Sequence, residues 1–168
     1  MINSVVAPFL ALILLNVPGS TALYPPSSEA APGLAAALAR AKASDRLVLV
    51  DFGANWCVWC RGLSHVFHHN DAIRELLRAR YEVTYVNVEQ FEANLDLAER
   101  LGVRGMQDTG IPILVILKPD GFVVERKDAG DFERRDGSGY SEEAVLRFLE
   151  KHACASEPAR LSRRRAGG

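Results

Sequence analysis

Hydrophobic and polar positions along the middle of the chain fall into blocks of two kinds. Continuous apolar runs rich in β-branched residues are typical of buried strands, and the strands they predict are 46–52, 81–88, 111–117 and 121–127. Runs of strong helix formers predict helices at 34–43, 57–68, 72–79, 94–102 and 141–152. The turn 118–121 joins the last two strands as an antiparallel hairpin. This order predicts an α/β fold, in which one mixed central β-sheet is flanked by helices on both faces.

An apolar block opens the chain. The first 28 residues contain no charged side chain, and the apolar run 5–17 is shorter than the roughly 20 residues that a membrane span needs. Such a run is typical of a signal peptide, and the small residues Ser20 and Ala22 predict cleavage after Ala22. Residues 1–22 are therefore interpreted as a signal peptide. An uncleaved N-terminal helix or a buried apolar element stays open, because no Lys or Arg precedes the block.

The rest of the sequence divides into a linker, one domain and a tail. Residues 23–32 are rich in Pro, Ser and Ala, which is typical of a linker. We expect the domain at 33–152, because 168 residues with 48% apolar composition suffice for one core without disulfide staples. Residues 153–168 are expected to be a disordered basic tail, whose arginines are Arg160, Arg163, Arg164 and Arg165. The net charge of −1 argues against a nucleic-acid partner, and we expect a monomer.

Two cysteines, Cys57 and Cys60, lie where the strand 46–52 gives way to a helix. Backbone N–H groups and the dipole at a helix N-terminus favour a thiolate at Cys57. Cys60, one turn further along, would then be the shielded residue that resolves a mixed disulfide. The same spacing occurs in zinc sites, but these usually contain a second such pair, which is missing from this sequence. The pair therefore favours redox chemistry without a metal or another cofactor.

Two segments resemble the signatures of thioredoxin-fold proteins. The segment VDFGANWCVWCR resembles the active-site segment, in which Val-Asp-Phe leads into Trp-Cys-x-x-Cys and a basic residue. The segment GIPILVIL resembles the second signature, a Gly-Ile-Pro that opens the third core strand with a cis proline peptide bond. The resemblance covers about residues 33–152. It implies a thioredoxin fold and a thiol-disulfide oxidoreductase that acts on protein thiols and disulfides.

The resemblance implies roles for individual residues by position. Asp51 matches the buried acid of the family, where desolvation should raise its pKa and let it exchange a proton with Cys60. The alternative is an acid that is simply hydrogen-bonded at a strand end. Pro112 matches the cis proline, and Ile111 before it would present backbone groups to an extended substrate. Trp56 matches the tryptophan beside the cysteines, although packing alone would explain it equally well.

Departures from the family pattern bear on function. The best-known members carry a lysine near the buried acid, and the matching position here is Tyr85. Val58 and Trp59 between the cysteines are bulky and apolar, so Trp59 is either a contact for a protein partner or part of the core. This dipeptide offers no histidine to stabilise a thiolate, so we expect the protein to reduce disulfides. Arg61 is the counterweight, because its charge would favour the thiolate. Residues 104–109 also lengthen the loop before the second signature.

The active-site segment is also similar to that of the C-terminal domain of the bacterial membrane thiol transporter, which passes electrons outward across the inner membrane. A reductase in an oxidising compartment must be recharged, so we expect such a membrane protein as electron donor. Together with the apolar leader, this indicates a periplasmic or secreted protein. A cytoplasmic or eukaryotic secretory location stays open.

Other functions stay open at this point. His65, His68 and His69 follow Cys60 on the same predicted helix and could bind zinc or copper. At about 100° per residue, however, these four side chains spread over about half of the helix circumference. A thioredoxin-like binding module without turnover is a further alternative. Cys154, just past the last predicted helix, could cross-link dimers or remain an idle thiol.

Overall fold

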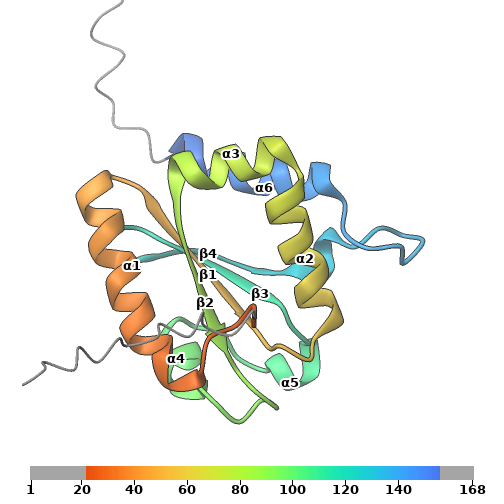
Figure 1. The fold of residues 1–168 in the computed structure, drawn as a ribbon, viewed down its shortest axis with the longest axis horizontal. Coiled ribbons are helices and arrows are strands. Elements are labelled where there is room, and N and C mark those ends of the chain that lie inside the picture. The colour runs from red at the N-terminus through yellow and green to blue at the C-terminus, as the bar shows by residue number, and fades with distance from the viewer. Residues whose placement is uncertain (1–21, 156–168) are drawn as a thin grey trace, which may run out of the picture.

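A four-stranded sheet forms the centre of the computed structural model, which describes residues 22–155 (Figure 1). The strands are β1 (Leu47–Gly53), β2 (Tyr81–Asn87), β3 (Ile113–Leu117) and β4 (Val123–Asp128). Their order is β2-β1-β3-β4. Strand β1 pairs parallel with β2 and antiparallel with β3, and β3 pairs antiparallel with β4. The sheet is therefore mixed, which confirms the prediction from the sequence.

Helices cover both faces of this sheet. They are α1 (Ala30–Ser44), α2 (Val58–His69), α3 (Asp71–Arg80), α4 (Leu95–Arg100), α5 (Met106–Thr109) and α6 (Glu142–Ala155). Short 3₁₀ turns precede α1 and follow β4, at Ser27–Glu29 and Ala129–Phe132. The side chains that α1 and α4 bury belong to one apolar cluster. The apolar side chains that α3 and α6 bury, and those of α2 beyond its first turn, belong to a second cluster on the other face (Figure 1).

Strand β1 is buried along its whole length and supplies side chains to both clusters. Val50 and Phe52 lie in the cluster under α1, whereas Leu47 and Leu49 lie in the cluster under α2, α3 and α6. Successive side chains of a strand point to opposite faces, so Asp51 points to the same side as Leu49. A completely buried carboxyl group therefore lies among the apolar side chains of the sheet.

Side-chain caps determine where two helices begin. The side chain of Asn70 accepts a hydrogen bond from the N–H of Ile73 at 3.0 Å and caps α3. The hydroxyl of Ser141 accepts from the N–H of Ala144 at 3.3 Å and caps α6. Such bonds satisfy the backbone N–H groups that the first turn of a helix leaves unpaired. The sequence left Asn70 and Asp71 open as the cap of α3, and the structure shows that the cap is Asn70, while Ser141 opens α6 as predicted.

The predicted linker is wrong for most of its length. Helix α1 begins at Ala30, and Tyr24 is buried in the cluster under α1, so the ordered domain includes residues 23–32. The composition of this segment was misleading because Pro32 lies in the first turn of α1, where a missing N–H costs no hydrogen bond. The chain before α1 is therefore a packed part of the domain.

Smaller differences occur further along. The helix predicted at 94–102 is confined to α4, and residues 104–109 contain the additional short helix α5. The predicted signal peptide and basic tail fall almost entirely outside the part that the structure describes. Cys154 lies at a position in α6, but its side chain is also outside that part. Between residues 22 and 155, no helix has the length and apolar character that crossing a membrane requires.

Candidate active site

Cys57 and Cys60 meet at the N-terminus of α2 and form a disulfide. Cys57 is the N-cap of α2, and its sulfur accepts a hydrogen bond from the N–H of Cys60 at 3.0 Å. An N–H group at a helix start therefore points at this sulfur, which favours negative charge there. Cys57 is nearly buried and Cys60 completely so. Cys57 is thus the outer and Cys60 the inner sulfur of the pair.

The Ile111–Pro112 peptide, directly before β3, lies against this pair. The peptide bond is cis, and the carbonyl oxygen of Ile111 lies 3.5 Å from the sulfur of Cys57. A thiol could donate a hydrogen bond to this oxygen, whereas a thiolate and a carbonyl oxygen are both acceptors. The fold therefore brings the two sequence motifs into contact.

Asp51 of β1 is completely buried. Its oxygen Oδ1 accepts a hydrogen bond from the hydroxyl of Tyr24 at 2.9 Å. Its other oxygen, Oδ2, has no hydrogen-bond partner within residues 22–155. Burial disfavours the charged form and raises the pKa of Asp51 to about 7, while the bond from Tyr24 acts in the lowering direction. Near neutral pH, Asp51 is therefore poised between its charged and neutral forms.

Two tyrosines flank this acid. Tyr85 is the register partner of Asp51 across β1 and β2, and its ring packs edge to face on Tyr24 with 5.6 Å between centroids. Burial, followed by the nearby Asp51 charge, raises the pKa of both hydroxyls above the usual range, so both are neutral. Tyr24 was not among the site residues predicted from the sequence. No local pattern marks it, because its partners Asn55 and Asp51 lie well downstream in the chain.

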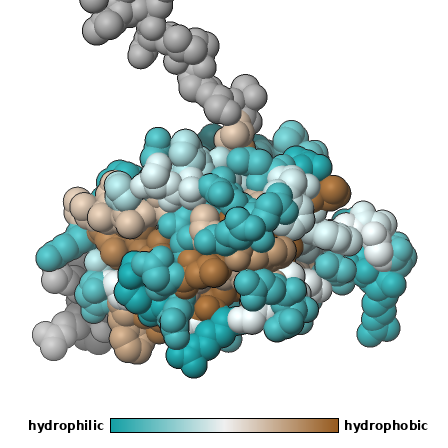
Figure 2. All heavy atoms as spheres, turned by 90° about the horizontal axis from the view of Figure 1, so that it is seen from below, coloured by the Kyte–Doolittle hydropathy of each residue, from teal (hydrophilic) through white to brown (hydrophobic). Residues whose placement is uncertain are grey.

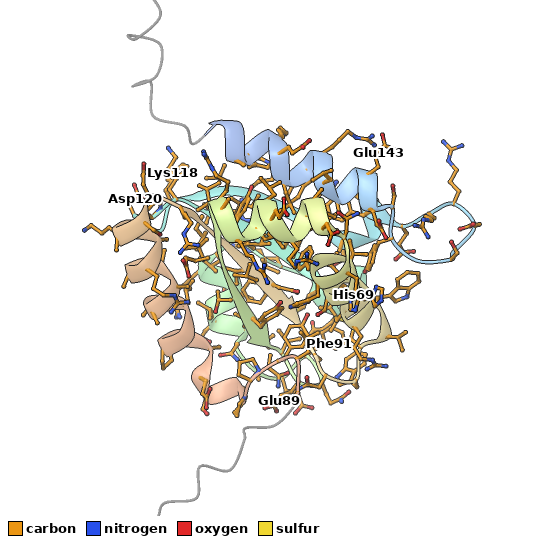
Figure 3. All side chains as sticks on the ribbon, turned by 45° about the horizontal axis from the view of Figure 1, so that its top comes forward. His69, Glu89, Phe91, Lys118, Asp120 and Glu143 are labelled. Carbon is orange, nitrogen blue, oxygen red and sulfur yellow. A yellow bond between two sulfur atoms is a disulfide. The ribbon has the colours of Figure 1, made fainter. Side chains whose placement is uncertain are left out.

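Trp56 lies on the surface beside the pair and is 46% exposed. Its ring packs edge to face on Phe91 at 5.7 Å, and its indole N–H donates to the carbonyl oxygen of Glu89 at 2.7 Å. Figure 3 shows Glu89 and Phe91 at the lower end of the molecule, with Lys118 and Asp120 of the β3–β4 turn at the opposite end. The loop after β2 therefore supports Trp56 at the active-site end.

Trp59 is partly exposed and partly packed. It is 37% exposed, and its ring lies edge to face on the buried Tyr140, with 5.4 Å between centroids. Its neighbour Val58 is 69% exposed. Figure 2, which views the molecule from the side of α4 and α5, shows hydrophobic side chains gathered among polar ones on this face. The sequence left open whether Trp59 is a contact surface or part of the core. One part of its side chain is exposed and another part packs on Tyr140.

The histidines of α2 bond to their own helix. A ring nitrogen of His68 lies 2.7 Å from the carbonyl oxygen of Ser64, and one of His69 lies 3.0 Å from that of His65. The rings of His65 and His69 stack at 3.9 Å. Within the described part of the chain, no group of three or more His, Cys, Asp or Glu side chains could hold a metal ion. The metal-binding alternative therefore gains no geometric support.

Comparisons with known proteins agree with this geometry. Residues 29–119 match the family model described as thioredoxin-like. A disulphide isomerase from Xylella fastidiosa Temecula1 is 31% identical, with a TM-score of 0.65 over 77% of this chain and 95% of that chain. A thioredoxin from Thermus thermophilus is 28% identical, with a TM-score of 0.50 over 70% of this chain and 81% of that chain. The oxidised C-terminal domain of Neisseria meningitidis DsbD is 17% identical, with a TM-score of 0.52 over 72% and 93%, and shows the fold alone. No curated protein matched the sequence.

A mixed sheet between two helical layers, with a cysteine pair at the first turn of α2, defines a thiol-disulfide oxidoreductase of thioredoxin fold. The chain belongs to the thioredoxin-like family.

Proposed function

We propose that this protein is an exported reductase of protein disulfides. The observation that carries the proposal is the Ile111 carbonyl oxygen, 3.5 Å from the sulfur of Cys57. An acceptor at this distance disfavours a thiolate, whereas the strong oxidants of this class rely on a stabilised reduced form. A destabilised reduced form lowers the reduction potential. Electrons therefore pass from the cysteine pair to the substrate.

Two groups stabilise the Cys57 thiolate and so act against a low reduction potential. The N–H of Cys60 donates to the sulfur of Cys57, and Arg61 adds a positive charge nearby. The guanidinium of Arg61, however, donates to the carbonyl oxygen of Asn55 at 2.8 Å, and the side chain is exposed. Water and salt screen an exposed charge, so its influence on the sulfur is reduced.

The proposed reaction has two exchange steps. The Cys57 thiolate attacks one sulfur of a substrate disulfide, a mixed disulfide forms, and the first substrate thiolate leaves. The Cys60 thiol then gives its proton to the Asp51 carboxylate, and its sulfur attacks that of Cys57. The Cys57–Cys60 disulfide forms and the second substrate thiolate leaves, so two electrons have passed to the substrate. A pKa of about 7 suits Asp51 to accept and release this proton near neutrality.

Extended segments of partner proteins are the proposed substrates. A peptide lying alongside the start of β3 would meet the backbone of Ile111 and Pro112 next to the Cys57 sulfur. Trp56 and Trp59, both partly exposed, would bind apolar side chains of the partner. These contacts select protein disulfides over small disulfides.

Export is proposed from the apolar run 5–17. In a periplasm or outside the cell, the oxidised pair needs an electron donor. We assign this role to a membrane thiol transporter, because the active-site segment is similar to that of its C-terminal domain. Fusion of residues 1–28 to a reporter that is active only after export tests the location, and a reporter retained in the cytoplasm would contradict it.

Insulin reduction tests the activity. The reduced protein should reduce insulin disulfides with dithiothreitol as donor, and Cys57→Ser should be inactive. A protein that binds insulin but leaves its disulfides intact would instead be a binding module without turnover.

A further inference from the structure

The segment 23–26 is bound to the active-site loop. The N–H of Tyr24 donates to Oδ1 of Asn55, and Nδ2 of Asn55 donates to the carbonyl oxygen of Tyr24, each at 2.9 Å. Nδ2 of Asn87, at the end of β2, donates to the carbonyl oxygen of Pro25 at 3.2 Å. These bonds hold the backbone of the segment against the loop that carries the cysteines and against the end of β2.

The hydroxyl of Tyr24 occupies space that Gly53 leaves free. A Cβ at Gly53 would overlap the hydroxyl oxygen of Tyr24 and would lie 2.9 Å from the sulfur of Cys60. The hydroxyl and the sulfur therefore border the same small space at the end of β1. Because this hydroxyl also donates to Asp51, it lies beside both groups that exchange a proton in the proposed reaction.

We infer that Tyr24 is a positioning residue for Asp51, which makes the segment before α1 part of the active site; the inference rests on the proposed function. The hydroxyl engages Oδ1 and leaves Oδ2, which has no partner in the described part of the chain, to take the proton from Cys60. It also stabilises the charged carboxylate, which burial disfavours. Without this bond, Asp51 would keep its proton near neutral pH and would be a poor base.

Tyr24 stabilises the charged form of Asp51, which a nearby cation could also do. Tyr85 is the register partner of Asp51 and supplies no positive charge, because its hydroxyl is neutral. The pKa of Asp51 is raised by burial and lowered by the hydrogen bond from Tyr24. The hydroxyl of Tyr24 is therefore the group that opposes burial.

A carboxyl titration tests the inference directly. In the oxidised full-length chain with ¹³C-labelled Asp carboxyl groups, the Asp51 signal is assigned by its loss in Asp51→Asn and followed by NMR against pH. Tyr24→Phe should raise the midpoint by about one pH unit, because it removes a charge-assisted hydrogen bond from a buried carboxylate. An unchanged midpoint in Tyr24→Phe would overturn the inference.

Tyr81→Phe is the matched control. The hydroxyl of Tyr81 is also buried and donates to the carbonyl oxygen of Leu149 at 2.7 Å, so both variants lose one buried hydrogen bond. Tyr81 lies four residues along β2 from Tyr85, the register partner of Asp51, which is about 13 Å along the strand. Tyr81→Phe should leave the Asp51 midpoint unchanged. An equal shift in both variants would mean a general loss of structure and would overturn the positioning role.

A second variant covers the case in which Tyr24→Phe fails to fold. Asn55→Ala removes both bonds that hold the Tyr24 backbone and should shift the Asp51 midpoint upward as well. An unchanged midpoint in a folded Asn55→Ala would overturn the inference.

A kinetic test separates positioning from general structure. The pH profile of insulin reduction should move to higher pH in Tyr24→Phe, but Tyr24→Phe should add no shift to Asp51→Asn. A shift that persists in the double variant would overturn the inference. Because the titration needs no substrate, a raised midpoint in a protein that fails to reduce insulin would support the positioning role and refute the proposed function.

Discussion

The hydroxyl oxygen of Tyr24 and Oδ1 of Asp51 are 2.9 Å apart, so the chain before α1 is hydrogen-bonded to the middle of the sheet. This contact depends on Gly53, because a Cβ there would overlap the Tyr24 hydroxyl. Gly53 has no positive φ, so its role is to leave room for the hydroxyl of Tyr24 beside Asp51.

Gly53→Ala should therefore destabilise the protein. Displacing the buried Tyr24 ring overpacks the site and breaks its bond to Asp51, and the free energy of unfolding should fall by about 2–4 kcal/mol. Gly62→Ala is the control: its Cβ would lie 3.7 Å from Tyr140, an ordinary contact, and alanine favours helix α2 by up to about 1 kcal/mol. Urea denaturation measures both. Equal stabilities of Gly53→Ala and wild type would show that Tyr24 does not need this space.

The two cysteines should behave differently when each is replaced. If Cys57 is the attacking sulfur, Cys60→Ser should accumulate mixed disulfides with substrate, because the resolving thiol is gone. Cys57→Ser should accumulate none and lose reductase activity, since Cys60 is completely buried. Non-reducing gels and mass spectrometry of the trapped species provide the measurement. Equal trapping by both variants would contradict the assignment.

Asp51 should lower the stability of the protein as the pH rises. Its pKa is about 7 in the folded protein against 3.8 in an exposed carboxyl, so between these values the folded state holds a proton that the unfolded state has lost. The contribution of Asp51 to the free energy of unfolding is fully present below about pH 4 and is lost as the pH rises through 7. The total loss is on the order of 4 kcal/mol.

Asp51→Asn removes this titration. Relative to wild type, the oxidised variant should gain stability progressively between about pH 4 and 7 in denaturant titrations. Its disulfide exchange should be slower near neutral pH, because no carboxylate accepts the proton from Cys60. Stability curves that run parallel over this pH range would show that Asp51 does not titrate there.

Much of this architecture could be predicted from local patterns. The apolar run that became β1, the cap at Asn70 and the cysteine pair after a strand each depend on residues close together in the sequence. The mixed sheet follows from the order of the elements, because crossover connections favour parallel pairing and tight turns favour antiparallel pairing.

The position of Tyr24 could not be predicted in this way. Its burial depends on Asn55, Gly53 and Asp51, which the fold brings together from positions well downstream. The composition of residues 23–32 is typical of linkers, and composition carries no information about such partners. The state of Trp59 was equally undetermined, because Tyr140, on which it packs, lies just before α6.

Trp59 should contribute to the binding of protein substrates and not to the binding of small disulfides. Trp59→Ala should lower kcat/KM for insulin by about 10-fold or more, since a partly exposed tryptophan beside a reactive sulfur is typical of a binding hot spot. Reduction of a small aromatic disulfide should change little. Phe122→Ala is the control, because Phe122 is 63% exposed in the β3–β4 turn. Equal losses for insulin and the small disulfide would point to damage at the cysteines themselves.

The reduction potential decides the direction of electron flow. We expect a value close to that of thioredoxin, about −270 mV, because the Ile111 carbonyl oxygen next to Cys57 disfavours the thiolate that strong oxidants stabilise. Arg61 acts in the opposite direction, so Arg61→Ala should lower the potential slightly further, and the difference should shrink at high salt. Equilibration with glutathione or dithiothreitol buffers, read by tryptophan fluorescence, measures both proteins. A wild-type potential near that of strong periplasmic oxidants, about −120 mV, would overturn the reductive assignment and would make the protein a donor of disulfides.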